Sequence, residues 1–223
     1  GLLDADIYGP SLPTMLGLKG QIPPLDEEKR KLIPLEVYGL KTISMGVLIS
    51  EDDAVVWRGP MLGKALQQLL EDVDWGELDY LVIDLPPGTG DVQLSPAQLT
   101  GINGAVIITT PQDVAHRDVV RAVQMFRTLN TPILGVVENM SYFVCPDNDQ
   151  TYYVFGKGRT EEVARELGLP MLQHIPLDLV VAPSADKGIP VAEVDPKGDQ
   201  AMRYEDLAYT VAAKIAVEAA ERQ

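Results

Sequence analysis

Short apolar stretches alternate along the chain with longer stretches of helical periodicity. From Met61 to Val73, apolar residues recur at intervals of three and four, which predicts an amphipathic helix. Continuous apolar runs such as Ala105 to Ile108 and Ile133 to Val137 instead predict strands that are buried on both faces. The predicted order is a strand end at 1–4, a strand at 41–47, a helix from 60 that ends by 75–76, strands at 80–84 and 105–110, a helix at 115–129, a strand at 133–138, a helix at 160–167, a strand at 171–175 and a helix at 204–219.

This alternation predicts an α/β fold, with a doubly wound, mostly parallel sheet. A chain of 223 residues with 46% hydrophobic residues can bury the core of one such domain, so we expect a single domain over 1–223. Thr160 is predicted to cap the helix that contains Glu161 and Glu162 in its first turn, and Gly168 to end it.

Composition excludes several classes of protein. The net charge of -15 and the pI near 4.4 repel phosphate backbones, so we expect no nucleic-acid partner. The apolar runs are far shorter than the about 20 residues that span a bilayer, and the start lacks a leader pattern. We therefore expect no membrane partner and a cytoplasmic location. Cys145 is the only cysteine, which excludes an internal disulfide, fits a reducing compartment and requires a second chain for any thiolate metal site.

Polar signatures follow four of the predicted strands. The run Y-L-V-I-D-L-P-P-G-T-G-D ends a strand at Asp84 and has the layout of a Walker B segment, in which the carboxylate holds a metal-bound water. Asp4 and Asp6 close the first strand, and the others end in T-P-Q-D and E-N-M. A single strand-end Asp commonly does no more than cap a turn. Because strand carboxyl ends form the ligand crevice of a parallel sheet, the four together predict a ligand site.

Five strings in a fixed order carry a family resemblance: D-A-D-I-Y-G-P-S, W-R-G-P-M, I-D-L-P-P-G-T-G-D, V-E-N-M-S-Y-F and I-P-L-D. With them, the chain resembles the Mrp/ApbC family of iron–sulfur carrier ATPases, which are relatives of the MinD and ParA P-loop ATPases. The resemblance extends from Gly1 through the S-A-D-K-G-I-P-V segment that ends at Val191. It implies a P-loop NTPase fold of the MinD/ParA type.

The resemblance implies roles at the phosphate end of ATP. Asp6 would orient or deprotonate the water that attacks the γ-phosphate, and Asp4 would support the shell of a magnesium ion. Asp84 would be the Walker B carboxylate that acts through a metal-bound water. Gly88 and Thr89 would form the second switch, which moves when the γ-phosphate leaves.

It also implies roles at the base. The amide of Asn139 would contact the adenine edge, and the backbone of Pro176 and Leu177 would line the base pocket. A GTPase would need N-K-x-D, whereas this segment reads N-M-S-Y, so ATP is the expected nucleotide. A dinucleotide dehydrogenase is disfavoured because no G-x-G-x-x-G follows a strand.

The chain departs from the family in its phosphate-binding loop. No G-x-x-x-x-G-K-S/T occurs anywhere in the sequence, and in the family this loop and its βα unit precede the segment that matches Gly1. We therefore expect that the first βα unit is missing. Because that strand is central, its loss would leave both neighbours with unpaired ladder groups. The 223-residue chain expressed alone is expected to hydrolyse no ATP and to fold poorly.

A second departure concerns the cluster ligands. In the family a C-x-x-C from each of two subunits holds one 4Fe-4S cluster. Here the segment reads Cys145-Pro146-Asp147-Asn148, so a homodimer supplies two thiolates. Either a bridging cluster is held weakly with outside thiols, or none is held and Cys145 is incidental.

Three functions follow from these patterns. The leading one is an ATP-dependent iron–sulfur cluster carrier that works as a homodimer and delivers a cluster to apo iron–sulfur proteins. A nucleotide-driven switch that binds a protein partner without a cluster is the second, and a fragment inactive as an ATPase is the third. His116 and His174 are interpreted as structural, and Trp57 and Met61 as packing residues.

Overall fold

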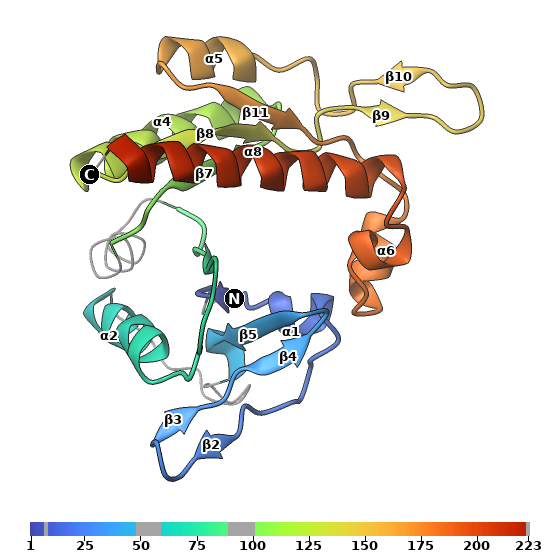
Figure 1. Cartoon of the computed structure of the whole chain (residues 1–223). Helices are drawn as coiled ribbons and strands as arrows, with labels where there is room; N and C mark the ends of the chain where they lie inside the picture. Colours follow the sequence, from blue (N-terminus) through green and yellow to red (C-terminus); the bar gives the residue numbers. More distant parts are fainter. Residues whose placement is uncertain (7–8, 48–58, 89–100, 222–223) are drawn as a thin grey trace. The chain divides into compact units, whose positions relative to one another are not determined.

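The computed structural model describes residues 1–6, 9–47, 59–88 and 101–221, which fall into two compact units. The first unit comprises Gly1–Thr100 and Pro183–Glu193, and the second comprises Gly101–Ala182 and Val194–Gln223. Each unit contains its own sheet (Figure 1).

The first unit is built on a four-stranded sheet in the order β4-β5-β1-β6. β1 (Leu2–Asp4) pairs in parallel with both β5 (Leu40–Ser44) and β6 (Val82–Asp84), whereas β4 (Leu35–Val37) pairs antiparallel with β5. Helix α2 (Gly59–Glu71) contributes the apolar face that the sequence predicts. Together with the sheet it forms one buried core, whose members are Leu3, Ala5, Ile43, Met45, Ala65, Leu66, Leu69, Val73 and Trp75.

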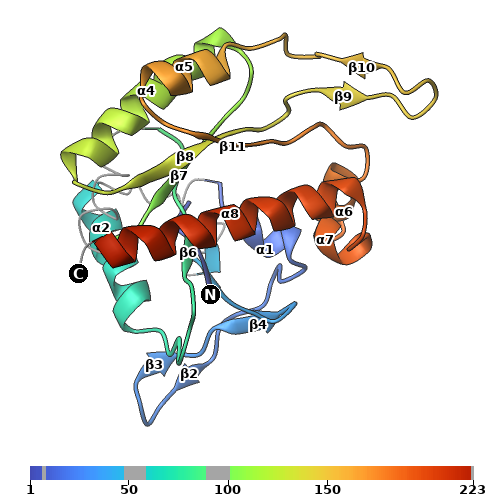
Figure 2. The ribbon, with the colours of Figure 1, turned by 45° about the horizontal axis from the view of Figure 1, so that its top comes forward.

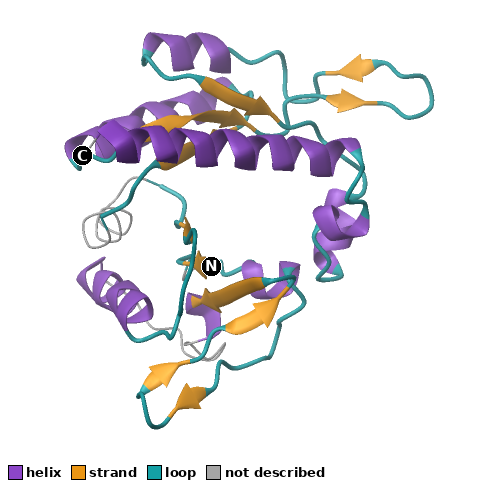
Figure 3. Ribbon diagram, viewed as in Figure 1, coloured by secondary structure: helices purple, strands orange, loops and turns teal. Residues whose placement is uncertain are grey.

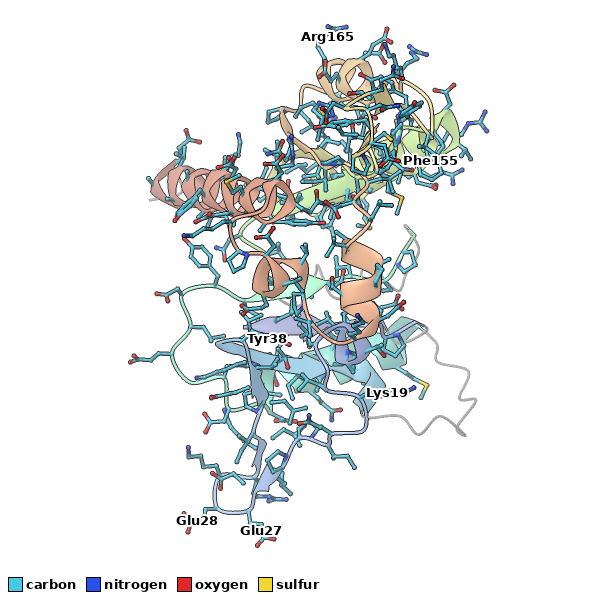
Figure 4. The ribbon with its side chains drawn as sticks, turned by 90° about the vertical axis from the view of Figure 1, so that its right-hand side faces the viewer. Lys19, Glu27, Glu28, Tyr38, Phe155 and Arg165 are labelled. Carbon is cyan, nitrogen blue, oxygen red and sulfur yellow. The ribbon has the colours of Figure 1, made fainter. Side chains whose placement is uncertain are left out.

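Short elements complete this unit. They are helix α1 (Leu12–Met15), the 3₁₀ turn at Met45–Val47, and the antiparallel strands β2 (Leu25–Asp26) and β3 (Lys31–Leu32). Glu27 and Glu28 lie at the turn between β2 and β3 (Figure 4).

The segment Pro183–Glu193 joins the first unit through a close approach of two glycine backbones. A Cβ on Gly188 would lie 2.5 Å from the Cα of Gly17, and Gly188 has a left-handed φ of +75°. The hydroxyl of Tyr38, labelled in Figure 4, donates a 2.9 Å hydrogen bond to the carbonyl of Gly188. Only glycine fits this position without strain.

The second unit has a fully parallel sheet in the order β11-β8-β7. Its strands are β7 (Ala105–Thr109), β8 (Ile133–Glu138) and β11 (Met171–His174). Helix α4 (Asp113–Thr128) contacts β7 and β8 from one face, and helix α8 (Asp199–Glu221) contacts β8 and β11 from the other (Figure 2). These parallel strands with helices on both faces confirm the predicted α/β, doubly wound class.

The remaining elements of this part of the chain are short. Helix α5 (Thr160–Glu166) packs near β8, and a hairpin of β9 (Phe143–Val144) and β10 (Thr151–Tyr152) extends beyond the sheet (Figure 3). The chain then forms helices α6 (Val181–Asp186) and α7 (Val191–Val194) before α8. No helix in the described part of the chain is long and apolar enough to cross a membrane.

Several predicted boundaries are wrong in instructive ways. The strand expected at 41–47 ends at Ser44, because the amide of Gly46 turns back to the Ser44 hydroxyl. The last helix begins at Asp199 rather than at Tyr204. Thr160 does not cap α5: Arg159 holds the cap position without a side-chain bond, and the Thr160 hydroxyl bonds elsewhere.

Candidate functional site

Three carboxylates gather at the carboxyl ends of β1 and β6, as the sequence predicts. Asp4 and Asp84 are register neighbours in the two strands, and the amide of Ala5 donates a 2.9 Å hydrogen bond to the carbonyl of Asp84. Asp6 follows two residues later in the loop. Loss of hydration raises the pKa of Asp84 above its ordinary value, and the nearby charge of Asp6 raises it further.

Asp4 is the buried member of this group, with 1% of its surface exposed. Its Oδ1 accepts the amide of Asp6 at 3.1 Å, and its Oδ2 accepts the hydroxyl of Ser44 at 2.8 Å. Burial raises the pKa of Asp4, and these two hydrogen bonds oppose that rise. The side chain is therefore fixed in one orientation by both of its oxygens.

The donor set suits a hard cation such as Mg²⁺. Carboxylate oxygens are the ligands that Mg²⁺ prefers, and a cation would relieve the repulsion that raises the pKa of Asp84. Among the described residues, no three His, Cys, Asp or Glu side chains are placed to hold a metal directly. The Walker B prediction for Asp84 is that its carboxylate holds an ion through the ion's own waters, and it stays a prediction.

The loop after Asp84 contains the predicted second switch. Gly88 is exposed and has a φ of +113°, a backbone conformation that favours glycine. Its neighbour Thr89 lies outside the described residues, as does Trp57.

The predicted base-binding residues come together in the second unit. Asn139 directly follows β8, and its backbone N–H donates a 2.8 Å hydrogen bond to the carbonyl of Thr109, while Pro176 and Leu177 follow β11. Backbone hydrogen bonds join the segment around Asn139 to the segment after β11. The N–H of Ile175 donates to the carbonyl of Glu138 at 2.9 Å, and the N–H of Ser141 donates to the carbonyl of Ile175 at 2.9 Å. The N–H of Leu177 donates to the carbonyl of Tyr142 at 2.7 Å. The structure thus places these three predicted residues just after the carboxyl ends of two paired strands, β8 and β11.

Two polar groups at this edge already have partners within the chain. The side-chain oxygen of Asn139 accepts the amide of Met140 at 2.9 Å, and the carbonyl of Pro176 accepts the side-chain amide of Gln200 at 3.3 Å. Gln200 is 5% exposed and lies at the start of α8.

A side-chain cluster around Glu138 was not predicted as part of the site. Glu138 is 6% exposed, and the hydroxyls of Ser141 and Thr160 both donate to its carboxylate. Nδ1 of His174 lies 3.2 Å from Glu138 Oε1 and also 3.2 Å from the Ser141 hydroxyl. A catalytic triad needs serine and carboxylate on opposite ring nitrogens, so this group is not one. The acidic residue that ends the apolar strand β8 was its only sequence signal.

Cys145 lies in the turn of the β9–β10 hairpin and is half-buried. Its amide donates to the carbonyl of Gln150 at 2.9 Å, which closes the hairpin. Asn148 stands where the resemblance implies a second cysteine, and its side-chain oxygen accepts the backbone amide of Gln150 at 3.0 Å. One chain therefore presents one thiol. The strand that follows leads into an exposed apolar run that includes Phe155 (Figure 4).

Comparison with known proteins identifies relatives over most of the chain. The chain is 53% identical over 209 residues to an iron-sulfur cluster carrier protein of Aquifex aeolicus, a match that covers 93% of the chain and 57% of that protein. It is 46% identical over 217 residues to the iron-sulfur cluster transfer protein NUBPL of Dictyostelium discoideum, covering 97% and 67%. The chain thus spans little more than half the length of the first relative.

Solved structures give the same fold. A nucleotide-binding protein of Archaeoglobus fulgidus in complex with ADP superposes with a TM-score of 0.75 at 35% identity, over 92% of this chain and 78% of that one. The cell division ATPase MinD of Pyrococcus furiosus superposes with a TM-score of 0.66 at 18% identity, over 95% and 85%, which supports the fold alone. The family model for the NUBPL iron-transfer P-loop NTPases of the ParA group matches residues 1–212. The chain belongs to this family of iron-transfer P-loop NTPases, which confirms the resemblance in its five strings.

Proposed function

We propose that the protein is an ATP-dependent iron–sulfur cluster carrier, which binds and hydrolyses ATP and transfers a cluster to apo iron–sulfur proteins. The observation that carries the proposal is the group of Asp4, Asp6 and Asp84 at the ends of two parallel strands. Relatives named as cluster carriers support the choice of cargo.

At the phosphates, each carboxylate has a distinct task. Asp6, in the loop after β1, accepts a proton from the water that attacks the γ-phosphate, so that ATP and water give ADP and phosphate. Asp84 and Asp4 hold the waters of a magnesium ion, and that ion supplies positive charge to the phosphate oxygens when bound. Gly88 and Thr89 respond to the presence of the γ-phosphate. Asp4 has little freedom to move because Ser44 and the Asp6 amide fix it.

At the base, Asn139 reads the adenine edge through its amide, and the backbone at Pro176 and Leu177 lines the pocket. The amide nitrogen of Asn139 is a donor, and its oxygen is shared with the Met140 amide. Donor and acceptor positions on adenine differ from those on guanine, so this edge favours ATP.

The cluster is the cargo. Cys145 of one chain and its counterpart in a second copy provide two thiolates, and outside thiols complete the ligand set of a 4Fe-4S cluster. A cluster held by fewer protein thiolates exchanges more readily, which suits transfer to an apoprotein.

A nucleotide-driven switch without a cluster is the second candidate. The observation that favours it is Asn148, whose side chain is engaged by the Gln150 amide rather than left to serve as a ligand. In this alternative the change between nucleotide states would alter binding of a protein partner.

Transfer assays on the complete gene product test the proposal. Reconstituted protein is mixed with an apo-ferredoxin, and the rise of the ferredoxin spectrum is followed with and without MgATP. We expect ATP to change the transfer rate, and Asp6→Asn to remove both hydrolysis and this ATP effect. A transfer rate that is identical with and without ATP in the wild-type protein would contradict the proposal.

A further inference from the structure

Glu138 is a buried carboxylate whose oxygens are fully engaged by side chains from other elements. The hydroxyls of Ser141 and Thr160 donate to it, and Nδ1 of His174 lies 3.2 Å from its Oε1. Thr160 opens α5, and its hydroxyl is also 3.1 Å from Nε2 of the buried His116 in α4. A buried carboxylate without such partners would be strongly destabilising, so Glu138 depends on these hydrogen bonds.

His174 lies between two carboxylates. Its Nδ1 faces Glu138, and its Nε2 lies 3.1 Å from Oε1 of Glu161, which is largely exposed on α5. The ring therefore faces a carboxylate oxygen at each of its two nitrogens. His174 thereby joins the end of β11 to the end of β8 and to α5.

Glu138 and His174 are the last residues of β8 and β11, and the residues proposed to bind the base follow them closely along the chain. Glu138 precedes Asn139, and His174 precedes the Ile175–Leu177 segment. Backbone hydrogen bonds from Ile175 to Glu138 and from Leu177 to Tyr142 continue the connection beyond the side-chain pair. The His174–Glu138 contact therefore lies next to the backbone hydrogen bonds that set the spacing between Asn139 and Pro176.

We infer that Glu138 and His174 are positioning residues for base recognition, which hold Asn139 at a fixed spacing from the Pro176–Leu177 backbone. The inference rests on the proposed nucleotide function and assigns to these two residues the discrimination between adenine and guanine. A directional hydrogen bond between a buried carboxylate and a partly exposed imidazole is suited to this because its geometry is more restrictive than apolar packing. Neither side chain needs to contact the nucleotide.

Equilibrium titrations of the complete gene product with MgADP and MgGDP test the inference. His174→Gln and Glu138→Gln each remove the contact between imidazole and carboxylate with little change in size. We expect the Kd for ADP to rise about tenfold in both variants, the effect of losing one hydrogen bond to a charged group. The Kd for GDP should change far less, so that the preference for adenine falls.

His116→Gln is the matched control, because His116 belongs to the same buried group but reaches Glu138 only through the Thr160 hydroxyl and has no hydrogen bond to β11 or to His174. It should lower the melting temperature and keep the wild-type preference for ADP over GDP. A preference that is unchanged in both His174→Gln and Glu138→Gln would overturn the inference while leaving the proposed function intact. A wild-type protein that binds neither nucleotide would overturn the proposed function, and the inference with it.

Discussion

The hydroxyl of Ser44 donates a 2.8 Å hydrogen bond to Oδ2 of Asp4, and both side chains are buried. The same hydroxyl accepts the amide of Gly46 at 3.0 Å, so the chain of hydrogen bonds runs from the turn after β5 into the carboxylate at the end of β1. Ser44 and Asp4 are also register neighbours in the parallel pairing of these strands. Ser44 therefore fixes a proposed magnesium-site residue from an adjacent strand.

Removing this hydroxyl should destabilise the protein. Ser44→Ala leaves Asp4 Oδ2 and the Gly46 amide without a partner in a buried place, which costs about 1 to 3 kcal/mol of unfolding free energy. Chemical denaturation measures the loss. Ser11→Ala is the control, because Ser11 is exposed and its side chain makes no capping bond to α1. Equal stabilities of the two variants would show that the Ser44 bond contributes nothing.

The raised pKa of Asp84 predicts how the stability of the protein changes with pH. Because the folded protein binds the Asp84 proton more tightly than the unfolded chain does, stability falls as the pH rises from the ordinary carboxyl pKa through the raised value. Asp84→Asn removes this dependence, so its melting temperature should exceed that of the wild type at pH 7 in the absence of magnesium. At pH 3 the two proteins should melt alike.

Asp206→Asn, on the exposed face of α8, controls for the removal of one negative charge from an acidic protein. It should leave the difference in melting temperature between pH 3 and pH 7 close to that of the wild type. A lower melting temperature for Asp84→Asn than for the wild type at pH 7 would refute the account of this carboxylate.

The contact between Gly188 and Gly17 predicts a large effect of one methyl group. Gly188→Ala forces a left-handed residue, at about 1 to 2 kcal/mol, and adds a clash worth about 1 to 3 kcal/mol. Gly20→Ala shares the left-handed backbone, with φ at +78°, but its Cβ would meet nothing within 4 Å. Thermal unfolding of both variants isolates the clash, which is disproved if they melt at the same temperature.

Restoring the second cysteine should strengthen cluster binding. Asn148→Cys recreates the C-x-x-C spacing in the β9–β10 turn, so that two copies offer four thiolates instead of two. We expect the reconstituted variant to keep its visible absorption longer than the wild type in the presence of a chelator. Asp147→Cys places a thiol one residue earlier, outside that spacing, and should give no such gain.

Apolar periodicity predicts the interior of this fold well. The strand at 133–138 and the helix that begins near Pro60 follow directly from runs of buried residues, since burial decides both patterns. Apolar periodicity cannot predict elements that are held by only a few backbone hydrogen bonds. The two-residue strands β9 and β10 and the antiparallel edge strand β4 are too short to show any period.

The candidate site divides in the same way. Asp4 and Asp84 can be predicted as neighbours because polar residues at the carboxyl ends of adjacent parallel strands lie together, and Asn139 can be predicted because it directly follows a strand of the second sheet. The side-chain contacts around them cannot, because Ser44, which bonds Asp4, and His174, which contacts Glu138, lie far from those residues in the sequence and carry no motif of their own. Thr160 is the clearest example. Its residue type and its position before Glu161 predict a helix cap, but its hydroxyl donates a hydrogen bond to the buried carboxylate of Glu138 instead.

The most direct test of the carrier proposal is the iron and acid-labile sulfide bound per chain after anaerobic reconstitution of the complete gene product. The wild-type protein should bind both and show visible absorption, and Cys145→Ala should lose the iron, the sulfide and the colour together. A wild-type protein without bound iron would contradict the proposal, and so would a Cys145→Ala variant that binds as much as the wild type.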